Sequence, residues 1–447
     1  MQEPVVCEGT PAEASRVSVA IVGGGACGLT AALALAGHGI ECVVLERDAS
    51  PSGSTALSSG FIPAPGTRAQ KAHGIVDSPA QFAVDIQNKA HGTAAPALVQ
   101  AYAEAIGPAL DVLESQHGLK FDVLDGFLYP GHSALRMHAV PEKTGAGLMT
   151  RLQRAADTAG VAVMTQALVR ELWVDEKSVI TGLGYERPDG STERLQCDAV
   201  LLACNGFGGN PALVSELLPE MREATFAGHT GNDGSAIAWG RGLGARLADL
   251  GGYQGHGSWV VPQAMLMTWA VMVEGGLQIN ARGQRFHDET QGYSEAAVDV
   301  LAQPGGVAWN VFDERLLTLA RTFPDFQAVE AAGALRRADD REALAALIGC
   351  APSGLCADVD RFNPPFYAVR VTGALFHTQG GLDIDRDCRV LRQDRTPFPN
   401  LLAAGGAARG VSGNAVWGYL SGNGLLSAIA GGSIAANTIA RTLKETP

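Results

Sequence analysis

The chain has 447 residues, which is too many for one ordinary hydrophobic core and predicts two domains or one large α/β domain with an insertion. Apolar residues make up 46% of it and charged residues 18%, as is typical of a well-buried globular enzyme. Its formal net charge is -13 and it has no basic stripe, which argues against nucleic acid as a partner.

Residues 1–15 are acidic and lack the apolar segment of a signal peptide, so we expect a flexible tail. Eight cysteines show neither a CxxC pair nor zinc-finger spacing, which predicts reduced, buried thiols, no metal site and a cytoplasmic protein. The small-apolar run from Gly424 to Ala440 is interrupted by Ser, Asn and Thr. It is predicted to be a buried helix and not a membrane span.

The first predicted elements form a strand–helix–strand unit. Residues 17–22 are a β-branched run, residues 29–37 are an alanine-rich helix, and residues 41–46 are a second apolar strand that ends in an acid. This order predicts a βαβ unit and therefore a parallel sheet.

The turn between the first strand and the helix has the pattern GxGxxG, with its glycines at Gly23, Gly25 and Gly28. Gly23 permits a tight turn, Gly25 lets the backbone approach a pyrophosphate, and Gly28 allows the helix to pack closely on the strand. Glu46 follows Gly28 by 18 residues and ends the second strand, where a carboxylate accepts hydrogen bonds from a ribose. The unit therefore predicts a dinucleotide site, which NAD and FAD share.

Residues 51–60, with the sequence PSGSTALSSG, favour FAD over NAD. Glycine and small hydroxyl residues let the backbone run close to a planar ring system, and their N–H and O–H groups can bond its polar edge. A flexible Ser/Gly loop is the plainer interpretation of the same residues.

Later segments predict helices within residues 78–117 and 148–159, strands at 161–164, 167–174 and 198–203, and a β-hairpin that turns at Asp189-Gly190. Between residues 263 and 365 charges and prolines become denser, and residues 335–347 have a helical pattern. We therefore expect a FAD-binding domain made of residues 16–262 and 366–447, with an inserted cap domain over residues 263–365.

The segment from Gly53 to Pro63 resembles the flavin loop of the fumarate reductase and 3-ketosteroid Δ1-dehydrogenase flavoprotein superfamily. Further similar patches are residues 201–210, 232–234, 276–289, 376–381, 402–405 and 422–427. The resemblance implies a Rossmann-like, glutathione-reductase-like α/β domain with an α+β cap. It implies FAD, and FAD is expected to be non-covalent because no histidine lies between His38 and His73.

The resemblance also implies which residues contact the cofactor. They are Gly23, Gly25, Ala26, Cys27, Gly28, Glu46, Arg47, Ser54, Thr55, Ser58, Ser59, Gly60, Leu168, Val169, Ala203, Cys204, Asn205, Gly206, Asn232, Asp233, Gly405, Gly406, Gly424, Leu425 and Leu426.

Two chemistries occur in this superfamily, and the reductases hold a dicarboxylate. By resemblance to them, Arg285 lies at the position of the proton donor, while Thr268 and His377 match substrate-binding residues. Two positions depart from that pattern, because Trp269 stands where a glutamate is usual and Tyr419 stands where a carboxylate-binding arginine is expected. The arginine that would bind a substrate carboxylate is therefore missing, and a tyrosine hydroxyl stands in its place.

The ketosteroid dehydrogenase pattern fits these departures better. In that branch a tyrosine base follows an Arg-Phe pair by seven residues, which matches Tyr293 after Phe286. Tyr419 and Gly422 resemble the hydroxyl and amide that polarise the substrate carbonyl, although their spacing is one residue shorter than in the family. Tyr129 resembles an aromatic residue on the substrate side.

The first hypothesis is therefore an FAD-dependent dehydrogenase that introduces a C=C bond α,β to a ketone, steroid-like or smaller. The second is a reductase of an activated alkene, and the third is a flavin-binding protein without turnover. Plainer readings remain for single residues: Tyr293 as a half-buried cap residue, His377 as a support of the flavin loop, and Arg285 as an ion pair with Glu289. The electron acceptor stays open, since no haem or iron–sulfur pattern is present.

Overall fold

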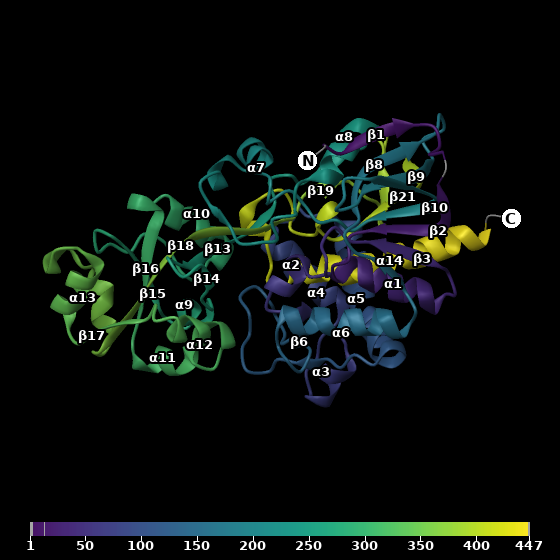
Figure 1. Cartoon of the computed structure of the whole chain (residues 1–447). Coiled ribbons are helices and arrows are strands. Elements are labelled where there is room, and N and C mark those ends of the chain that lie inside the picture. The colour runs from purple at the N-terminus through teal and green to yellow at the C-terminus, as the bar shows by residue number, and fades with distance from the viewer. Residues whose placement is uncertain (1–2, 13, 446–447) are drawn as a thin grey trace. The chain divides into compact units, whose positions relative to one another are not determined.

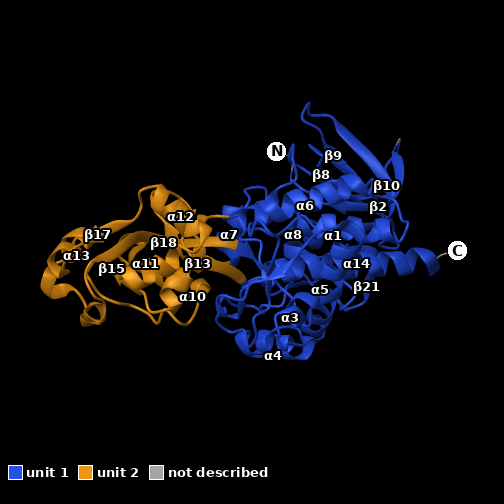
Figure 2. Cartoon of the chain, turned by 90° about the horizontal axis from the view of Figure 1, so that it is seen from below, with its two compact units in different colours: residues 1–217, 228–252, 377–447 blue, residues 218–227, 253–376 orange. Residues whose placement is uncertain are grey.

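A computed structural model describes residues 3–12 and 14–445 (Figure 1). The chain divides into two compact units, shown in Figure 2: unit 1 is residues 1–217, 228–252 and 377–447, and unit 2 is residues 218–227 and 253–376. The predicted cap, residues 263–365, falls within unit 2. Unit 2 is larger than this prediction because strands on both sides of the predicted limits pair with the cap sheet.

The centre of unit 1 is a parallel sheet in the order β7-β3-β2-β10-β21. These strands are β2 (Ser15–Val22), β3 (Cys42–Leu45), β7 (Ala162–Met164), β10 (Thr192–Leu202) and β21 (Pro397–Ala403). Val22 is paired with Leu45 on one side and with Leu202 on the other, so these strands end in register. The predicted βαβ unit and the α/β fold class are confirmed.

An antiparallel extension is attached to the first half of β10. It consists of β9 (Ile180–Glu186) and β8 (Leu168–Val174), and the predicted hairpin turn is present, with Gly190 at φ 84°. The predicted strand at 198–203 is the second half of the continuous β10. The prediction of a loose tail is wrong for β1 (Val5–Glu8), because this segment pairs in parallel with β8.

Helices of small residues pack against the sheet of unit 1. α1 (Ala26–Gly37) lies against α14 (Asn423–Glu445), and α5 (Pro96–His117) packs beside α14. A Cβ at Gly432 would lie 2.5 Å from the Cys27 carbonyl oxygen, which explains why this helix contact requires glycine. The predicted buried helix is therefore confirmed, and within residues 3–12 and 14–445 no helix is long and apolar enough to cross a membrane.

Unit 2 is built on a mainly antiparallel sheet in the order β14-β13-β18-β16-β15. These strands are β13 (Tyr253–Val260), β14 (Met265–Leu266), β15 (Leu277–Asn280), β16 (Val307–Phe312) and β18 (Phe366–Thr378), and β18 continues into unit 1 at His377. β11 (Thr225–Phe226) pairs with β18, which brings residues 218–227 into this unit. The helix predicted at 335–347 begins later, as α13 (Arg341–Ile348), after the short strand β17 (Arg336–Ala338).

The remaining helices and strands are shorter or peripheral. In unit 1 they are α2 (Gly53–Leu57), β4 (Ile62–Pro63), α3 (Arg68–Ala72), α4 (Pro79–Lys89), β5 (Asp122–Val123), β6 (Met137–Ala139), α6 (Gly145–Thr158), α7 (Pro211–Leu217), α8 (Ser235–Leu243), β12 (Leu247–Ala248), β19 (Gly381–Leu382) and β20 (Arg389–Leu391). In unit 2 they are α9 (Ala270–Val273), α10 (Tyr293–Leu301), α11 (Glu314–Ala320) and α12 (Pro324–Ala331).

Candidate active site

The glycine turn joins β2 to α1 at the carboxyl edge of the parallel sheet. Gly23 has φ 107°, and a Cβ there would lie 2.5 Å from the Ala203 carbonyl oxygen. A Cβ at Gly28 would lie 1.9 Å from the Gly23 carbonyl oxygen. A Cβ at Gly25 would meet only the Thr55 hydroxyl, at 3.7 Å. Packing therefore requires the first and third glycines, whereas the second borders open space at the start of α1.

The start of α1 has the features of an anion site. Gly25 is its N-cap and provides no side chain to cap the first turn. The Ala26 N–H donates to the Thr55 hydroxyl over a long 3.3 Å. Amide groups at a helix N-terminus attract phosphate, so this turn fits the pyrophosphate of a dinucleotide.

Glu46 is buried beside the turn, with 6% of its surface exposed. Its carboxylate accepts hydrogen bonds from the Gly24 N–H at 2.8 Å and the Asp48 N–H at 2.9 Å, one on each oxygen. Each oxygen keeps a lone pair that can accept a ribose hydroxyl. Unit 1 therefore has the polar groups that the adenosine half of FAD needs.

The serine-rich segment is an ordered part of unit 1 and begins with the short helix α2. The Ser54 hydroxyl accepts hydrogen bonds from the His229 N–H at 3.2 Å and the Asn232 side-chain amide at 2.9 Å. The Ser58 hydroxyl accepts from the Gly60 N–H at 3.1 Å. These hydrogen bonds argue against a flexible loop. The predicted contact Ser59 lies between Ser58 and Gly60.

The other predicted flavin contacts gather at strand ends. Gly206 follows β10, and a Cβ there would lie 1.9 Å from the Thr378 hydroxyl and 3.1 Å from the Gly406 carbonyl oxygen. Asp233 is paired with Arg47 at 3.4 Å and with Arg170 at 3.1 Å, so the predicted Arg47 contributes to an ion cluster. The positions of the rest are as follows: Leu168 and Val169 begin β8, Cys204 and Asn205 follow β10, Gly405 follows β21, and Gly424, Leu425 and Leu426 lie in the first turns of α14.

Tyr419 lies in the turn that leads into α14 and is 6% exposed. Burial raises the pKa of the Tyr419 phenol well above its usual range, while backbone hydrogen bonds from Gly424 and Gly422 act in the opposite direction. The phenol is therefore protonated at neutral pH.

His377 contacts Tyr419 edge-to-face, with ring centroids 5.4 Å apart. Its Nδ1 lies 3.0 Å from the Gln379 side-chain nitrogen, which can only donate. The same Nδ1 lies 3.4 Å from the Thr378 carbonyl oxygen. Burial lowers the pKa of His377 to about 4, so the ring is neutral. A Cβ at Gly424 would lie 2.7 Å from its Nε2. The structure thus brings two predicted residues, His377 and Tyr419, together as two neutral polar side chains.

A buried chain of hydrogen bonds supports this pair, and the sequence analysis missed it. The Gln379 side-chain oxygen accepts from the Ser412 hydroxyl at 2.9 Å, and Ser412 accepts from the Asn423 amide at 2.9 Å. Ser412 and Asn423 are 0% exposed. No local motif marks Ser412, because its role depends on contacts between distant segments.

Unit 2 contains a second cluster, around Tyr293. Tyr293 is the first residue of α10, and its ring stacks on His256 with centroids 4.8 Å apart. His256 also contacts Trp269 at 5.9 Å and Phe376 at 5.5 Å. Burial lowers the pKa of His256 to about 3, so its ring is neutral. The sequence analysis missed His256. Its contact with Tyr293 becomes visible only when β13 packs against α10.

Arg285 is an ion-pair residue in this structure. Its guanidinium donates to both oxygens of Glu289, at 2.6 Å for the shortest contact, and lies 3.6 Å from Asp358. The buried Glu289 raises the pKa of Arg285 further. Arg285 is therefore a poor proton donor as it stands.

Thr268 is 8% exposed, and its hydroxyl accepts a hydrogen bond from the Ala270 N–H at 3.3 Å, at the start of α9.

Tyr129 is half-buried in unit 1. Its ring contacts Phe127 at 4.9 Å and Phe61 at 6.4 Å, both edge-to-face. The structure gives this predicted substrate residue aromatic neighbours, and Phe61 directly follows the serine-rich segment.

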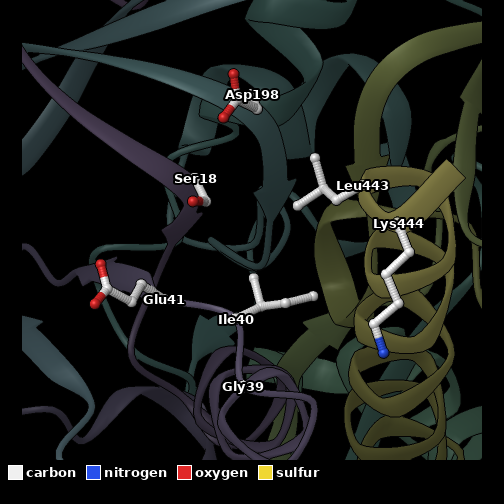
Figure 3. A pocket seen from close by; sticks show the side chains of 7 residues that line it. All are labelled: Ser18, Gly39, Ile40, Glu41, Asp198, Leu443 and Lys444. Carbon is white, nitrogen blue, oxygen red and sulfur yellow. The ribbon is translucent and has the colours of Figure 1, made fainter. Parts of the chain in front are cut away.

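A surface cavity of about 460 Å³ lies elsewhere on unit 1, and Figure 3 shows the seven residues around it. Ser18 is in the first half of β2, Glu41 precedes β3, and Lys444 is near the end of α14. These positions are away from the carboxyl ends of the parallel strands, where α/β sheets bind their ligands. None of the predicted site residues lines this cavity.

The glycine turn and the strand-end contacts agree with a comparison against protein families. A family model described as "FAD binding domain" matches residues 18–425. The chain belongs to the FAD binding domain family. It is therefore an FAD-dependent enzyme of the predicted superfamily, and its homologues are oxidoreductases that act on CH–CH groups. A non-covalent linkage to FAD stays a prediction.

Curated relatives in this family include reductases and dehydrogenases. The chain is 26% identical over 455 residues to the probable fumarate reductase Ifc3 of Shewanella frigidimarina, covering 96% of this chain and 76% of the relative. It is 23% identical over 538 residues to the 4-oxocyclohex-2-ene-1-carboxylate 5-dehydrogenase of Sinomonas cyclohexanicum, covering 90% of each.

Solved structures share the fold at lower identity. The open form of a flavocytochrome c3 fumarate reductase superposes with a TM-score of 0.83 at 24% identity, over 96% of this chain and 78% of that one. A 3-ketosteroid-Δ4-(5α)-dehydrogenase from Rhodococcus jostii RHA1 superposes with a TM-score of 0.78 at 23% identity, over 98% of this chain and 99% of that one. These likenesses support the α/β FAD-binding fold.

Proposed function

We propose that the protein dehydrogenates a small cyclic ketone, forming a C=C bond between the carbons α and β to the carbonyl. The observation that carries this proposal is the pair of neutral donors, His377 and Tyr419, at the start of α14. Neutral donors suit a carbonyl oxygen, whereas a dicarboxylate requires cations.

The donor pair explains how the α-proton becomes acidic. As the proton leaves, charge develops on the carbonyl oxygen, and preorganised donors stabilise that enolate. The Tyr419 hydroxyl is the main donor in this proposal. The Gly422 N–H is the second proposed donor to the carbonyl oxygen, as the sequence predicted.

Tyr293 is the proposed base. Its place at the N-terminus of α10 favours a negative charge, because the helix dipole stabilises a phenolate there. The phenolate takes the α-proton, and stacking on His256 holds its ring in place. FAD, when bound, would supply a hydride acceptor for the β-hydrogen of the substrate. Thr268, Trp269 and Tyr129 remain candidates for substrate contact, and the predicted flavin contacts belong to this proposal.

The name of the Sinomonas relative supports a small ring, because that protein is named for a cyclohexene carboxylate. The ion pair between Arg285 and Glu289 argues against the reductase alternative, because it holds the guanidinium that would donate the proton. The 26% identity to a probable fumarate reductase argues for the reductase alternative. The direction of the reaction therefore needs an experiment.

Anaerobic mixing of the oxidised FAD-loaded enzyme with cyclohexanone and with 4-oxocyclohexanecarboxylate tests the proposal. We expect the visible absorbance of the oxidised flavin to bleach while the corresponding enone forms. The proposal is wrong if the oxidised flavin stays unchanged with these ketones and the reduced enzyme is reoxidised only by fumarate or urocanate.

A further inference from the structure

Gln379 is fixed in the core of unit 1 by its backbone and by its side chain, and it is 3% exposed. Its backbone N–H donates to the Gly252 carbonyl at 2.7 Å, and its carbonyl accepts from the Gly410 N–H at 2.7 Å. Its side-chain oxygen accepts from the Ser412 hydroxyl at 2.9 Å. Its side-chain nitrogen lies 3.0 Å from Nδ1 of His377. Gln379 therefore connects His377 to the segment that leads into α14.

The direction of this hydrogen-bond chain is set by Asn423, which is 0% exposed. Its side-chain nitrogen donates to the Ser412 hydroxyl at 2.9 Å, and its side-chain oxygen has no hydrogen-bond partner among the described residues. Turning this amide round would leave both hydrogens of the nitrogen buried without an acceptor. Buried N–H groups without a partner are rarer in proteins than carbonyl oxygens without one, so Asn423 donates to Ser412.

Each later bond in the chain follows from this first one. Because the Ser412 oxygen already accepts from Asn423, its hydroxyl proton is directed at the Gln379 side-chain oxygen. The Gln379 amide then has its nitrogen facing His377, and an amide nitrogen can only donate. Nδ1 of His377 must accept this bond, so the proton of the neutral ring is on Nε2.

The Thr378 carbonyl favours the opposite tautomer of His377, but it is the more distant partner. Its oxygen lies 3.4 Å from Nδ1, compared with 3.0 Å for the Gln379 nitrogen. A proton on Nδ1 would point a second donor at that nitrogen and break the closer contact. The tautomer of His377 therefore depends on which way the Gln379 amide faces.

Nε2 of His377 faces the start of α14. A Cβ at Gly424 would lie 2.7 Å from this nitrogen, and the ring packs edge-to-face on Tyr419 with centroids 5.4 Å apart. Burial keeps the ring uncharged, since it lowers the pKa of His377 to about 4. A proton on Nε2 makes the ring a neutral hydrogen-bond donor at this position, whereas a proton on Nδ1 would make it an acceptor.

We propose that Gln379 is a positioning residue that keeps the proton of His377 on Nε2. Ser412 and Asn423 contribute by fixing the direction in which the Gln379 amide faces. Gln379 acts through His377, and the tautomer is a property of the folded core of unit 1. Its effect on catalysis rests on the proposed function, in which His377 donates to the carbonyl oxygen of the substrate.

¹⁵N spectroscopy of the histidine rings tests the tautomer directly. In the FAD-loaded protein labelled with ring-¹⁵N histidine, a nitrogen that carries a proton and one that does not resonate far apart. The sequence has ten histidines, and loss of one pair of signals in His377→Gln assigns this ring. We expect Nε2 of His377 to be the protonated nitrogen at neutral pH. A proton on Nδ1 in the wild-type protein would overturn the proposal.

The test variant is Gln379→Met, which has a side chain of similar length and no donor. It leaves the Thr378 carbonyl as a partner of Nδ1, so we expect the proton of His377 to move from Nε2 to Nδ1. Gln379→Leu also lacks a donor and gives the same readout if Gln379→Met does not accumulate. A His377 ring that keeps its proton on Nε2 in the variant obtained would overturn the role of Gln379.

Gln87→Met is the matched control. Gln87 is half-buried in α4 of unit 1, and its side-chain nitrogen donates to the Ala94 carbonyl at 3.0 Å. This hydrogen bond goes to a backbone carbonyl and not to a histidine ring. We expect Gln87→Met to lose a side-chain hydrogen bond, as Gln379→Met does, with the His377 signals unmoved. The same movement of these signals in both variants would contradict a specific role of Gln379.

The kinetic readout connects the tautomer to catalysis. We expect kcat for a cyclic ketone to fall about tenfold in Gln379→Met with KM nearly unchanged, since one hydrogen bond is at stake. Gln87→Met should keep the wild-type kcat, and equal loss in the two variants would contradict a positioning role. If the tautomer behaves as expected but ketones reduce no flavin in the wild-type enzyme, the role of Gln379 stands and the proposed function fails.

Discussion

Two tyrosines, one in each unit, stand in opposite surroundings. Tyr419 is 6% exposed, and backbone hydrogen bonds at its oxygen come from Gly422 and Gly424. Tyr293 is half-buried at the first position of α10 and packs its ring on neutral His256. The first environment keeps a phenol protonated, and the second places a phenol at the positive end of a helix dipole.

This contrast supports the proposal that one tyrosine donates a proton and the other accepts one. Burial disfavours the charged form of Tyr419, which suits the proposed donor. A helix N-terminus favours negative charge, which suits the proposed base, Tyr293. The two environments come from separate units, and each can be altered without touching the other.

The largest effect is expected from Tyr293→Phe. Without its base the enzyme should bleach its flavin with a cyclic ketone about 10³-fold more slowly, within the usual range for loss of a general base. Stopped-flow absorbance measures this rate. Tyr367→Phe is the control, since Tyr367 lies in the unit 2 core and bonds Glu314. A rate within about threefold of wild type would remove Tyr293 as the base and break the contrast.

Tyr419→Phe should have the next largest effect. Losing one preorganised donor to a developing oxyanion typically costs about 10² in kcat. The control is Tyr102→Phe, because Tyr102 is 0% exposed in the same unit, packed beside Gly431 of α14. Steady-state turnover of the ketone measures both variants. Equal losses in the two would show that Tyr419 acts through packing alone.

Gly25→Ala tests whether FAD binds through the glycine turn of unit 1. The new methyl group has room in the protein, since only the Thr55 hydroxyl lies near it at 3.7 Å, but it would occupy space needed by the pyrophosphate. We expect the Kd for FAD to rise at least about tenfold, or about 1.4 kcal/mol, with the apoprotein melting temperature unchanged. Titration of apoprotein by flavin fluorescence measures this affinity.

The controls for Gly25→Ala are Gly126→Ala, where a Cβ meets nothing within 4 Å, and Tyr293→Phe in unit 2. Both should bind FAD as the wild type does. A normal Kd in Gly25→Ala would contradict the assignment of the pyrophosphate to this turn.

The smallest effect is a pH dependence caused by the neutral histidines. Burial lowers the pKa of His256 to about 3, below the roughly 6.5 of an unfolded histidine, so the unfolded chain binds a proton that the folded chain does not. The free energy of unfolding therefore falls as pH drops from about 6.5 toward 3, by at most about 1.4 kcal/mol per pH unit for this residue. Urea unfolding at several pH values measures the slope.

His256→Phe should reduce that slope by up to one proton, and His132→Phe should do the same for unit 1, because burial also lowers the pKa of His132 to about 4. An unchanged slope in His256→Phe would mean that this histidine is protonated in the folded protein. The statement that the His256 ring stacked on Tyr293 is neutral would then be wrong, and the two tyrosines would differ less in their surroundings.

The sequence by itself determined the cofactor and the main fold. The GxGxxG turn, the strands on either side of α1 and the acid at Glu46 are close in sequence, and local spacing is enough to predict such a unit. The resemblance also made Tyr293, Tyr419 and His377 candidates, because their motifs are short, and their roles stay predictions. β1 was mistaken for a tail because its pairing with β8 is non-local, and a single edge strand has a weak pattern of its own.

Only the tertiary structure decided how the candidate residues are supported. His132 and Ser421 are 289 positions apart in sequence, yet they share a hydrogen bond. Likewise, the sequence allows Arg285 to be a proton donor or an ion-pair residue, and its contact with Glu289 favours the ion pair. Protonation states follow from burial and from hydrogen-bond partners, and both are set by which segments pack together. The GxGxxG turn therefore predicts the cofactor from local spacing, whereas the burial of Tyr419 before α14 follows from the packing of distant segments.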